Sequence, residues 1–251
     1  MGLVYLFTGD IGSVEAESGE ILLQSLAFLP ILWFLSLVFN KKLMLRDFFN
    51  RRTTPFTVTQ YFSVILLIFT VSIGLEGLVS FVLTWLSPTY VESVVAEPIL
   101  DGGTAQRNLV TIILAVLIGP LMEEIVFRGL IFQRLAIRFG LSSAILTSSI
   151  IFGLLHFESF LGAAVFGMFM CFLFYHTKNL LIPVLVHILN NVVAVIIDVV
   201  LRNDDTFGLE TYRSANLIFM IGLVGLPLMY VFFKHNWPKD LGQLPILFHR
   251  H

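Results

Sequence analysis

Charged residues are scarce in this chain. Asp, Glu, Lys and Arg together make up 13% of its 251 residues, whereas hydrophobic residues make up 57%. Mean hydropathy is +0.91, which is too high for a chain that water keeps soluble and monomeric, so we expect an integral membrane protein embedded in a lipid bilayer. The net charge of −2 offers no basic surface, and we expect no nucleic-acid partner.

Cysteine is almost absent as well. The one cysteine, Cys171, excludes an internal disulfide and lies within an apolar stretch. A lone thiol in such a place is usually a small buried hydrophobe. A thiolate nucleophile would need an activating group, and no histidine stands near Cys171 at a suitable spacing, so we do not expect cysteine catalysis.

Long apolar windows dominate the rest of the chain, and each is close to the roughly 20 residues that a spanning helix needs. They lie at about 20–40, 58–86, 108–132, 141–158, 160–176, 181–201 and 214–233. The sequence therefore predicts an all-α, polytopic membrane helix bundle of about seven transmembrane helices, forming a single domain over 1–251. The second window is long enough to tilt or break near Gly74 and Gly77.

Basic residues in the short loops predict the orientation, because loops rich in Lys and Arg stay in the cytoplasm. The loop 41–52 carries five of them, whereas the loops 87–107 and 202–213 are mainly acidic. This alternation continues along the chain. We expect a multi-pass protein of the plasma (inner) membrane with its N-terminus outside and its C-terminus in the cytoplasm.

Three charged residues interrupt the third window, namely Glu123, Glu124 and Arg128. Each charge at the centre of a membrane helix costs about 2.5 to 3.5 kcal/mol, so the three together oppose insertion by about 8 to 10 kcal/mol unless they pair or serve a function. Glu124 and Arg128 are four residues apart, which places them on one helix face as an ion pair. Glu123 points elsewhere, and we expect it to be the carboxylate available as a general base.

Other polar residues stand in later apolar helices: His156 in the fourth, and His187 with Asn191 in the sixth. His187 and Asn191 are four residues apart, so both can present a donor to one point, as stabilisation of an oxyanion requires. One glutamate, two histidines and an asparagine on three helices are costly in lipid unless they form a common site.

Helix lengths are compatible with such a site. Gly140 is the expected turn of a hairpin, with Glu123 17 residues before it and His156 16 residues after it, so both lie about 25 Å from the tip. His187 lies only about 12 Å from the cytoplasmic end of its own helix. Glu123, His156 and His187 then lie at the same depth in the membrane if the tip of the hairpin projects about 12 Å into the cytoplasm.

These motifs resemble those of a known family. Glu-Glu-x-x-x-Arg at 123–128, Phe-x-x-x-His at 152–156 and His-x-x-x-Asn at 187–191 are similar to the motifs of the CPBP or Abi family of intramembrane proteases, which includes the Rce1-type CAAX prenyl endopeptidases. The resemblance implies a catalytic core over 108–201 that hydrolyses a peptide bond by glutamate-activated water. A membrane-associated peptide or protein, possibly lipidated, would be the substrate.

The same resemblance implies a role for each matching residue. Glu123 would be the general base assisted by His156, His187 and Asn191 would stabilise the oxyanion, and Glu124 and Arg128 would support them. We expect no metal or other cofactor. Zinc is the alternative, and Glu123, His156 and His187 would be its ligands, although the His-Glu-x-x-His sequence of common zinc proteases is absent.

Two other classes of function stay open. Buried Glu, His and Arg also serve proton relays, so a proton-coupled transporter is possible, although the chain shows no inverted repeat. A non-catalytic immunity or scaffold protein on the same fold is the second alternative. Glu76, in the second window, has no assigned role.

Overall fold

The computed structural model describes residues 36, 57–96, 99–100, 105–156, 159–202 and 208–239. The first predicted window, apart from Ser36, and the basic loop 41–52 lie outside the described residues. The orientation in the membrane therefore stays a prediction, as does the division into domains.

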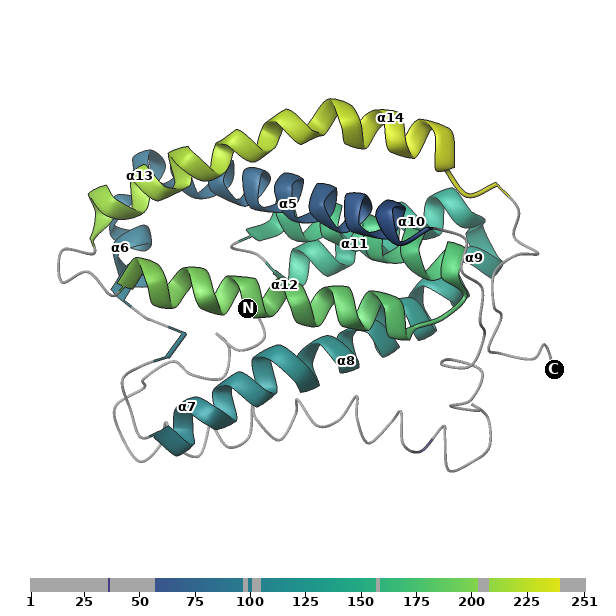
Figure 1. Cartoon of the computed structure of the whole chain (residues 1–251), viewed down its shortest axis with the longest axis horizontal. Coiled ribbons are helices and arrows are strands. Elements are labelled where there is room, and N and C mark those ends of the chain that lie inside the picture. The colour runs from purple at the N-terminus through teal and green to yellow at the C-terminus, as the bar shows by residue number, and fades with distance from the viewer. Residues whose placement is uncertain are drawn as a thin grey trace.

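The described residues form a bundle of helices without strands (Figure 1). In chain order the elements are α5 (Val58–Leu86), α6 (Pro88–Ala96), α7 (Ala105–Ile112), η1 (Ile113–Ile118), α8 (Gly119–Glu124), η2 (Ile125–Ile131), α9 (Phe132–Phe139), α10 (Leu141–Leu155), α11 (Phe160–Thr177), α12 (Leu181–Arg202), α13 (Leu209–Phe219), η4 (Met220–Gly225) and α14 (Leu226–Asn236). Here η1 and η2 are π-helices and η4 is a 3₁₀-helix. The predicted all-α membrane bundle is confirmed.

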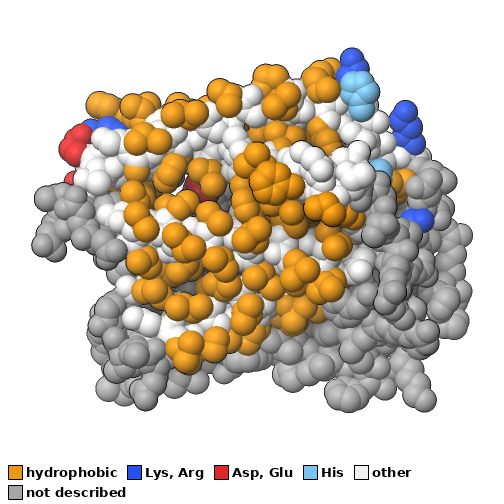
Figure 2. Space-filling model, in the orientation of Figure 1, with side chains coloured by type: hydrophobic (Ala, Val, Ile, Leu, Met, Phe, Trp, Pro, Cys, Tyr) orange, Lys and Arg blue, Asp and Glu red, His pale blue; other side chains and the backbone are white. Residues whose placement is uncertain are grey.

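Five stretches of helix are long and apolar enough to cross a bilayer, namely Val58–Leu86, Asn108–Phe139, Phe160–Thr177, Leu181–Leu201 and Leu209–Asn236. Each coincides with a predicted window. The window at 141–158 is also helical, but α10 has only 15 residues and is shorter than a spanning helix needs. Hydrophobic side chains cover most of the visible face of the described residues, as expected of a surface in contact with lipid (Figure 2).

The long helix α5 does not break at its glycines; it runs without interruption for 29 residues. Gly74 and Gly77 instead allow close packing against α13 and η4, which run along α5 in Figure 1. A Cβ atom at Gly74 would lie 2.6 Å from the backbone carbon of Gly222, and one at Gly77 would lie 2.9 Å from Asn216 O. Small residues of this kind let membrane helices approach at backbone distance.

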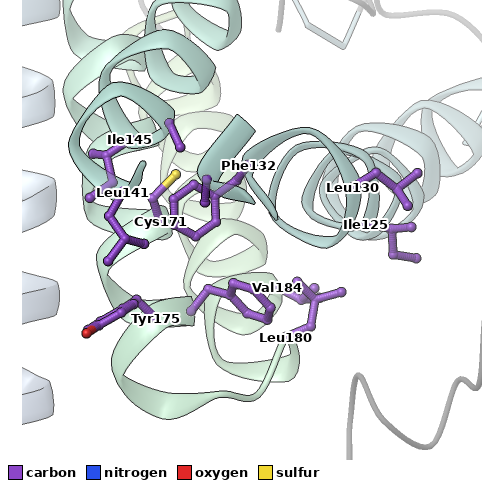
Figure 3. Packing of buried hydrophobic residues seen from close by; sticks show 12 residues of the cluster. Ile125, Leu130, Phe132, Leu141, Ile145, Cys171, Tyr175, Leu180 and Val184 are labelled. Carbon is purple, nitrogen blue, oxygen red and sulfur yellow. The ribbon is translucent and has the colours of Figure 1, made fainter. Parts of the chain in front are cut away.

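Helix α11 forms the centre of the bundle, because its Phe169, Met170 and Leu173 side chains are fully buried. It packs along α10 and also contacts α5 and α12. A second cluster of buried residues, to which α11 contributes Cys171 and Tyr175, is shown in Figure 3, where Cys171 lies beside Phe132 and Ile145. The buried position of Cys171 agrees with its expected role as a small hydrophobe.

The turn between the third and fourth windows lies at Gly140, as predicted. Gly140 has a φ of 83°, a conformation that L side chains rarely adopt, and its N–H bonds to Ala136 O at 3.0 Å. The turn reverses the chain between α9, whose Arg134 and Arg138 are exposed, and α10. This hairpin sets Glu123 and His156 on neighbouring helices at a similar level. Its projection from the membrane stays a prediction.

Candidate active site

Two π-helices flank the glutamate pair. The helix from Ala105 to Phe139 changes to π geometry over Ile113–Ile118, returns to α geometry over Gly119–Glu124, and changes again over Ile125–Ile131. Segments of π-helix are rare and frequently occur at functional sites. Pro120 stands between them, where its missing N–H prevents a regular ladder of backbone hydrogen bonds.

Glu124 is fully buried and has two charged or polar partners on one oxygen. Its Oε1 lies 2.8 Å from Arg128 Nη1 and 2.8 Å from His187 Nδ1. The Arg128 guanidinium also donates to Gly167 O at 3.2 Å. The predicted ion pair between Glu124 and Arg128 is thus present. The contact with His187 is not predicted, because 63 residues separate the partners and no local spacing signals it.

Glu123 lies between the two histidines. Its Oε2 is 3.8 Å from His156 Nε2 and 3.8 Å from His187 Nε2. The Glu123 side chain is 14% exposed, and its Oε2 is buried without a hydrogen-bond partner among the described residues. The structure therefore brings together three predicted site residues from α8, α12 and the end of α10. Their chemical roles stay predictions.

Hydrogen bonds at the far side of each imidazole place a proton on Nδ1 and leave Nε2 as the nitrogen near Glu123. His156 Nδ1 lies 2.8 Å from Phe152 O, and a carbonyl oxygen can only accept, so Nδ1 carries the proton. By the same argument His187 Nδ1 donates to the Glu124 carboxylate. In neutral rings both Nε2 atoms then point a lone pair towards Glu123. Glu123 Oε2 and both Nε2 atoms are then all acceptors, so none of them can donate a hydrogen bond to another.

The aromatic ring of Phe152 packs against both histidines and against Arg128. Its ring stacks on His156 with centroids 4.4 Å apart, and it meets His187 edge-on at 5.9 Å. The Arg128 guanidinium lies 4.7 Å from the centre of the same ring, within the range of a cation–π interaction. Phe152 therefore contacts three of the polar residues at once. The Phe-x-x-x-His spacing carries this signal, because it places both rings on one helix face.

Asn191 forms hydrogen bonds with a neighbouring helix and with its neighbour in sequence, and its predicted role in stabilising an oxyanion stays a prediction. Its Nδ2 donates to Ala115 O in η1 at 2.8 Å, and its Oδ1 accepts from Asn190 Nδ2 at 3.3 Å. At least one of its amide hydrogens is thus directed at a backbone carbonyl.

Glu76 lies on α5 beside the first turn of α11. The Cβ atom of Glu76 is 3.6 Å from the position that a Cβ atom at Gly162 would take.

The three converging residues do not fit a tetrahedral zinc ion as they stand. Ligand atoms bonded to zinc at 2.0 to 2.1 Å lie about 3.3 Å from one another. The two separations between Glu123 Oε2 and the histidine Nε2 atoms are both 3.8 Å. Among the described residues, no group of three His, Cys, Asp or Glu side chains has the arrangement of a metal site. We derive no chemical step through a metal.

Comparison with known proteins finds a family model that matches the stretch containing this site. Residues 105–193 match the model of the type II CAAX prenyl endopeptidase Rce1-like family. The match runs from α7 into α12 and contains every site residue discussed above except Glu76. This stretch is similar to the Rce1-like family, as its motifs predicted, and the chain is an integral membrane protein with several spanning helices.

A relative with a curated description is similar over a shorter stretch. The chain is 35% identical over 107 residues to the "Putative membrane peptidase YdiL" of Bacillus subtilis (strain 168). The match covers 42% of this chain and 43% of the relative, so the chain spans less than half the length of the relative it matches. No solved structure matches the chain.

Proposed function

We propose that this protein is an intramembrane endopeptidase that hydrolyses a peptide bond of a membrane-associated peptide or protein with a water molecule activated by Glu123. The Rce1-like domain and the similarity to a protein described as a membrane peptidase support this class of activity. The observation that carries the proposal is the buried Oε2 of Glu123, which lies 3.8 Å from both histidine Nε2 atoms and has no hydrogen-bond partner among the described residues.

A water molecule suits the position between these acceptors because it can donate two hydrogen bonds. In the proposed reaction Glu123 takes one proton from this water while the oxygen attacks the carbonyl carbon of the substrate. The resulting tetrahedral intermediate carries a negative oxygen. The C–N bond then breaks, and the proton held by Glu123 passes to the leaving amine, so that an acid and an amine are released and Glu123 regains its charge.

Charge balance suggests where a further proton resides. Three acceptors cannot all be satisfied by the two hydrogens of one water, so one of them needs its own proton. The ionised Glu123, Glu124 and Arg128 carry a net charge of −1, which is costly in a buried cluster. A proton on His187, which lies between both carboxylates, makes the cluster neutral. His187 Nε2 is then a donor that can stabilise the negative oxygen.

Asn191 can supply a second donor to the negative oxygen, because an amide NH₂ carries two hydrogens and the bond to Ala115 O uses one.

The proposed setting is the plasma membrane, with the N-terminus outside. The substrate is proposed to be a membrane peptide or protein that reaches the site within the bilayer. A CAAX-like, lipidated substrate is the form that the family suggests.

The decisive experiment compares the membrane peptides of cells that produce the native protein, the Glu123→Gln variant or the Glu210→Gln variant, by mass spectrometry. Glu210 is a matched control, because its carboxylate pairs with Arg213 at the surface, with the Glu210 side chain 82% exposed. We expect at least one peptide to be processed by the native and Glu210→Gln proteins and to accumulate uncut with Glu123→Gln. If no peptide differs, the protein is not a peptidase under these conditions and a scaffold or transport function takes precedence.

A further inference from the structure

Pro120 leaves a backbone carbonyl of its own helix without the usual donor. In η1 the hydrogen bonds span five residues, as the bond from Gly119 N–H to Leu114 O shows. In this frame the donor to Ala115 O would be the N–H of residue 120. Residue 120 is a proline, which has no N–H. The carbonyl of Ala115 therefore needs a donor from another part of the molecule.

Asn191 provides that donor from the neighbouring helix α12. Its Nδ2 lies 2.8 Å from Ala115 O, a good distance for an amide hydrogen bond. Both groups belong to helices apolar and long enough to span a membrane, where water is not available to satisfy a free carbonyl. Pro120 removes a donor and Asn191 replaces it.

This bond joins the same two helices as the contact between Glu124 and His187. Four residues separate His187 from Asn191 on α12, so the two cross-links start from one face of that helix. Together they tie the helix that carries Glu123 to the helix that carries His187. We infer that Asn191 is a positioning residue, which holds Glu123 against α12 by donating to the carbonyl that Pro120 leaves without a backbone partner. The inference rests in part on the proposed function, because the residue being positioned is the proposed base.

Unfolding of the purified full chain tests the bond without reference to activity. The chain is kept in mixed micelles and unfolded by titration with dodecyl sulfate. Leucine has a volume similar to that of asparagine but no amide, so Asn191→Leu leaves the Ala115 carbonyl without a hydrogen-bond donor. We therefore expect the unfolding equilibrium constant to rise roughly tenfold. Pro120→Ala restores a backbone N–H. In that background Asn191→Leu should change the equilibrium constant by less than about threefold. An equal loss in both backgrounds would overturn the inference.

Two controls make the result specific to this pair. Asn216 is an asparagine on another helix, and its Nδ2 donates to Tyr212 O at 2.9 Å in α13, remote in sequence from Pro120. The effect of Asn216→Leu should be the same with and without Pro120→Ala. Asn191→Gln keeps an amide donor on a longer side chain, so it should lose less stability than Asn191→Leu. Equal losses from Asn191→Gln and Asn191→Leu would count against the hydrogen bond.

Turnover of a cleaved peptide tests the positioning role. If Asn191 holds Glu123 in place in addition to its proposed donation to the oxyanion, adding Pro120→Ala to Asn191→Leu should recover part of the lost kcat, measured relative to Pro120→Ala alone. An undiminished kcat loss would mean that Asn191 acts directly on the reacting atoms, and the positioning role would be wrong. If the native protein itself cleaves nothing, the proposed function fails, while the unfolding measurements still decide whether the bond exists.

Discussion

Glu123 and Glu124 are adjacent in sequence, but replacing each by glutamine should change stability in different ways. Glu124 is fully buried and its Oε1 lies 2.8 Å from both Arg128 Nη1 and His187 Nδ1. Breaking a buried ion pair from one side costs about 3 to 5 kcal/mol, because the remaining charge is left without compensation. Glutamine keeps an oxygen that can accept, so we expect Glu124→Gln to lower the free energy of unfolding by about 3 kcal/mol.

Glu123→Gln should have nearly no cost, or even a small gain. Its Oε2 is buried without a hydrogen-bond partner among the described residues, which is itself unfavourable, and His187 can release its proposed proton when the Glu123 charge is removed, so that the cluster stays neutral. Removing this charge should change the free energy of unfolding by less than about 1 kcal/mol, with stabilisation the favoured sign. Peptide turnover should nevertheless be lost. Such an opposition of stability and activity is common at functional sites.

The assay measures unfolding in mixed micelles, with tryptophan fluorescence as the readout of the transition. The yield of folded protein is a second measure. Glu210→Gln serves as the control, because exposed ion pairs contribute little, and it should leave the unfolding transition unchanged. A difference of less than 1 kcal/mol between Glu124→Gln and Glu123→Gln would refute the reasoning. So would a Glu124→Gln protein that unfolds normally and has lost only turnover.

Three further predictions concern the packing and chemistry of the site. Phe152→Leu removes the ring that stacks on His156, and we expect a loss of kcat with KM little changed; a loss confined to KM would assign Phe152 to substrate binding. Gly74→Ala places a Cβ 2.6 Å from the Gly222 backbone, so the free energy of unfolding should fall by about 1 to 3 kcal/mol, and an unchanged transition would show that α5 and η4 separate easily. Cleavage by a metal-stripped preparation should persist in the presence of a chelator, whereas restoration of a lost activity by zinc alone would show that the 3.8 Å separations close around a metal.

Helix type and the main polar contacts could be predicted from the sequence because both depend on short, regular spacings. Apolar windows of about 20 residues indicate spanning helices, and the four-residue spacing of Glu124 and Arg128 indicates their ion pair. The hairpin at Gly140 could likewise be predicted, because only glycine readily adopts the positive φ found there.

Contacts between distant helices could not be predicted in the same way. No spacing relates His187 to Glu124, so the assignment of Glu124 to Arg128 alone was incomplete. Nor does the i, i+4 spacing of His187 and Asn191 show that the Asn191 amide bonds to Ala115 O. One local signal was available, since a proline within an apolar helix implies a carbonyl that another helix must satisfy. Of the two possibilities for α5, tilt or break, the break is absent because close packing against η4 uses its glycines.

The short helix α10 has a consequence for the backbone beside the candidate site. Its 15 residues extend about 22 Å, roughly 8 Å less than the hydrocarbon core of a bilayer. The chain leaves helical geometry at His156, next to Glu123. Non-helical backbone at membrane depth is tolerated only where protein buries it or where it lines a wet cavity. His156 is buried, so the early end of α10 places a break in the helical backbone beside Glu123 inside the protein rather than against lipid.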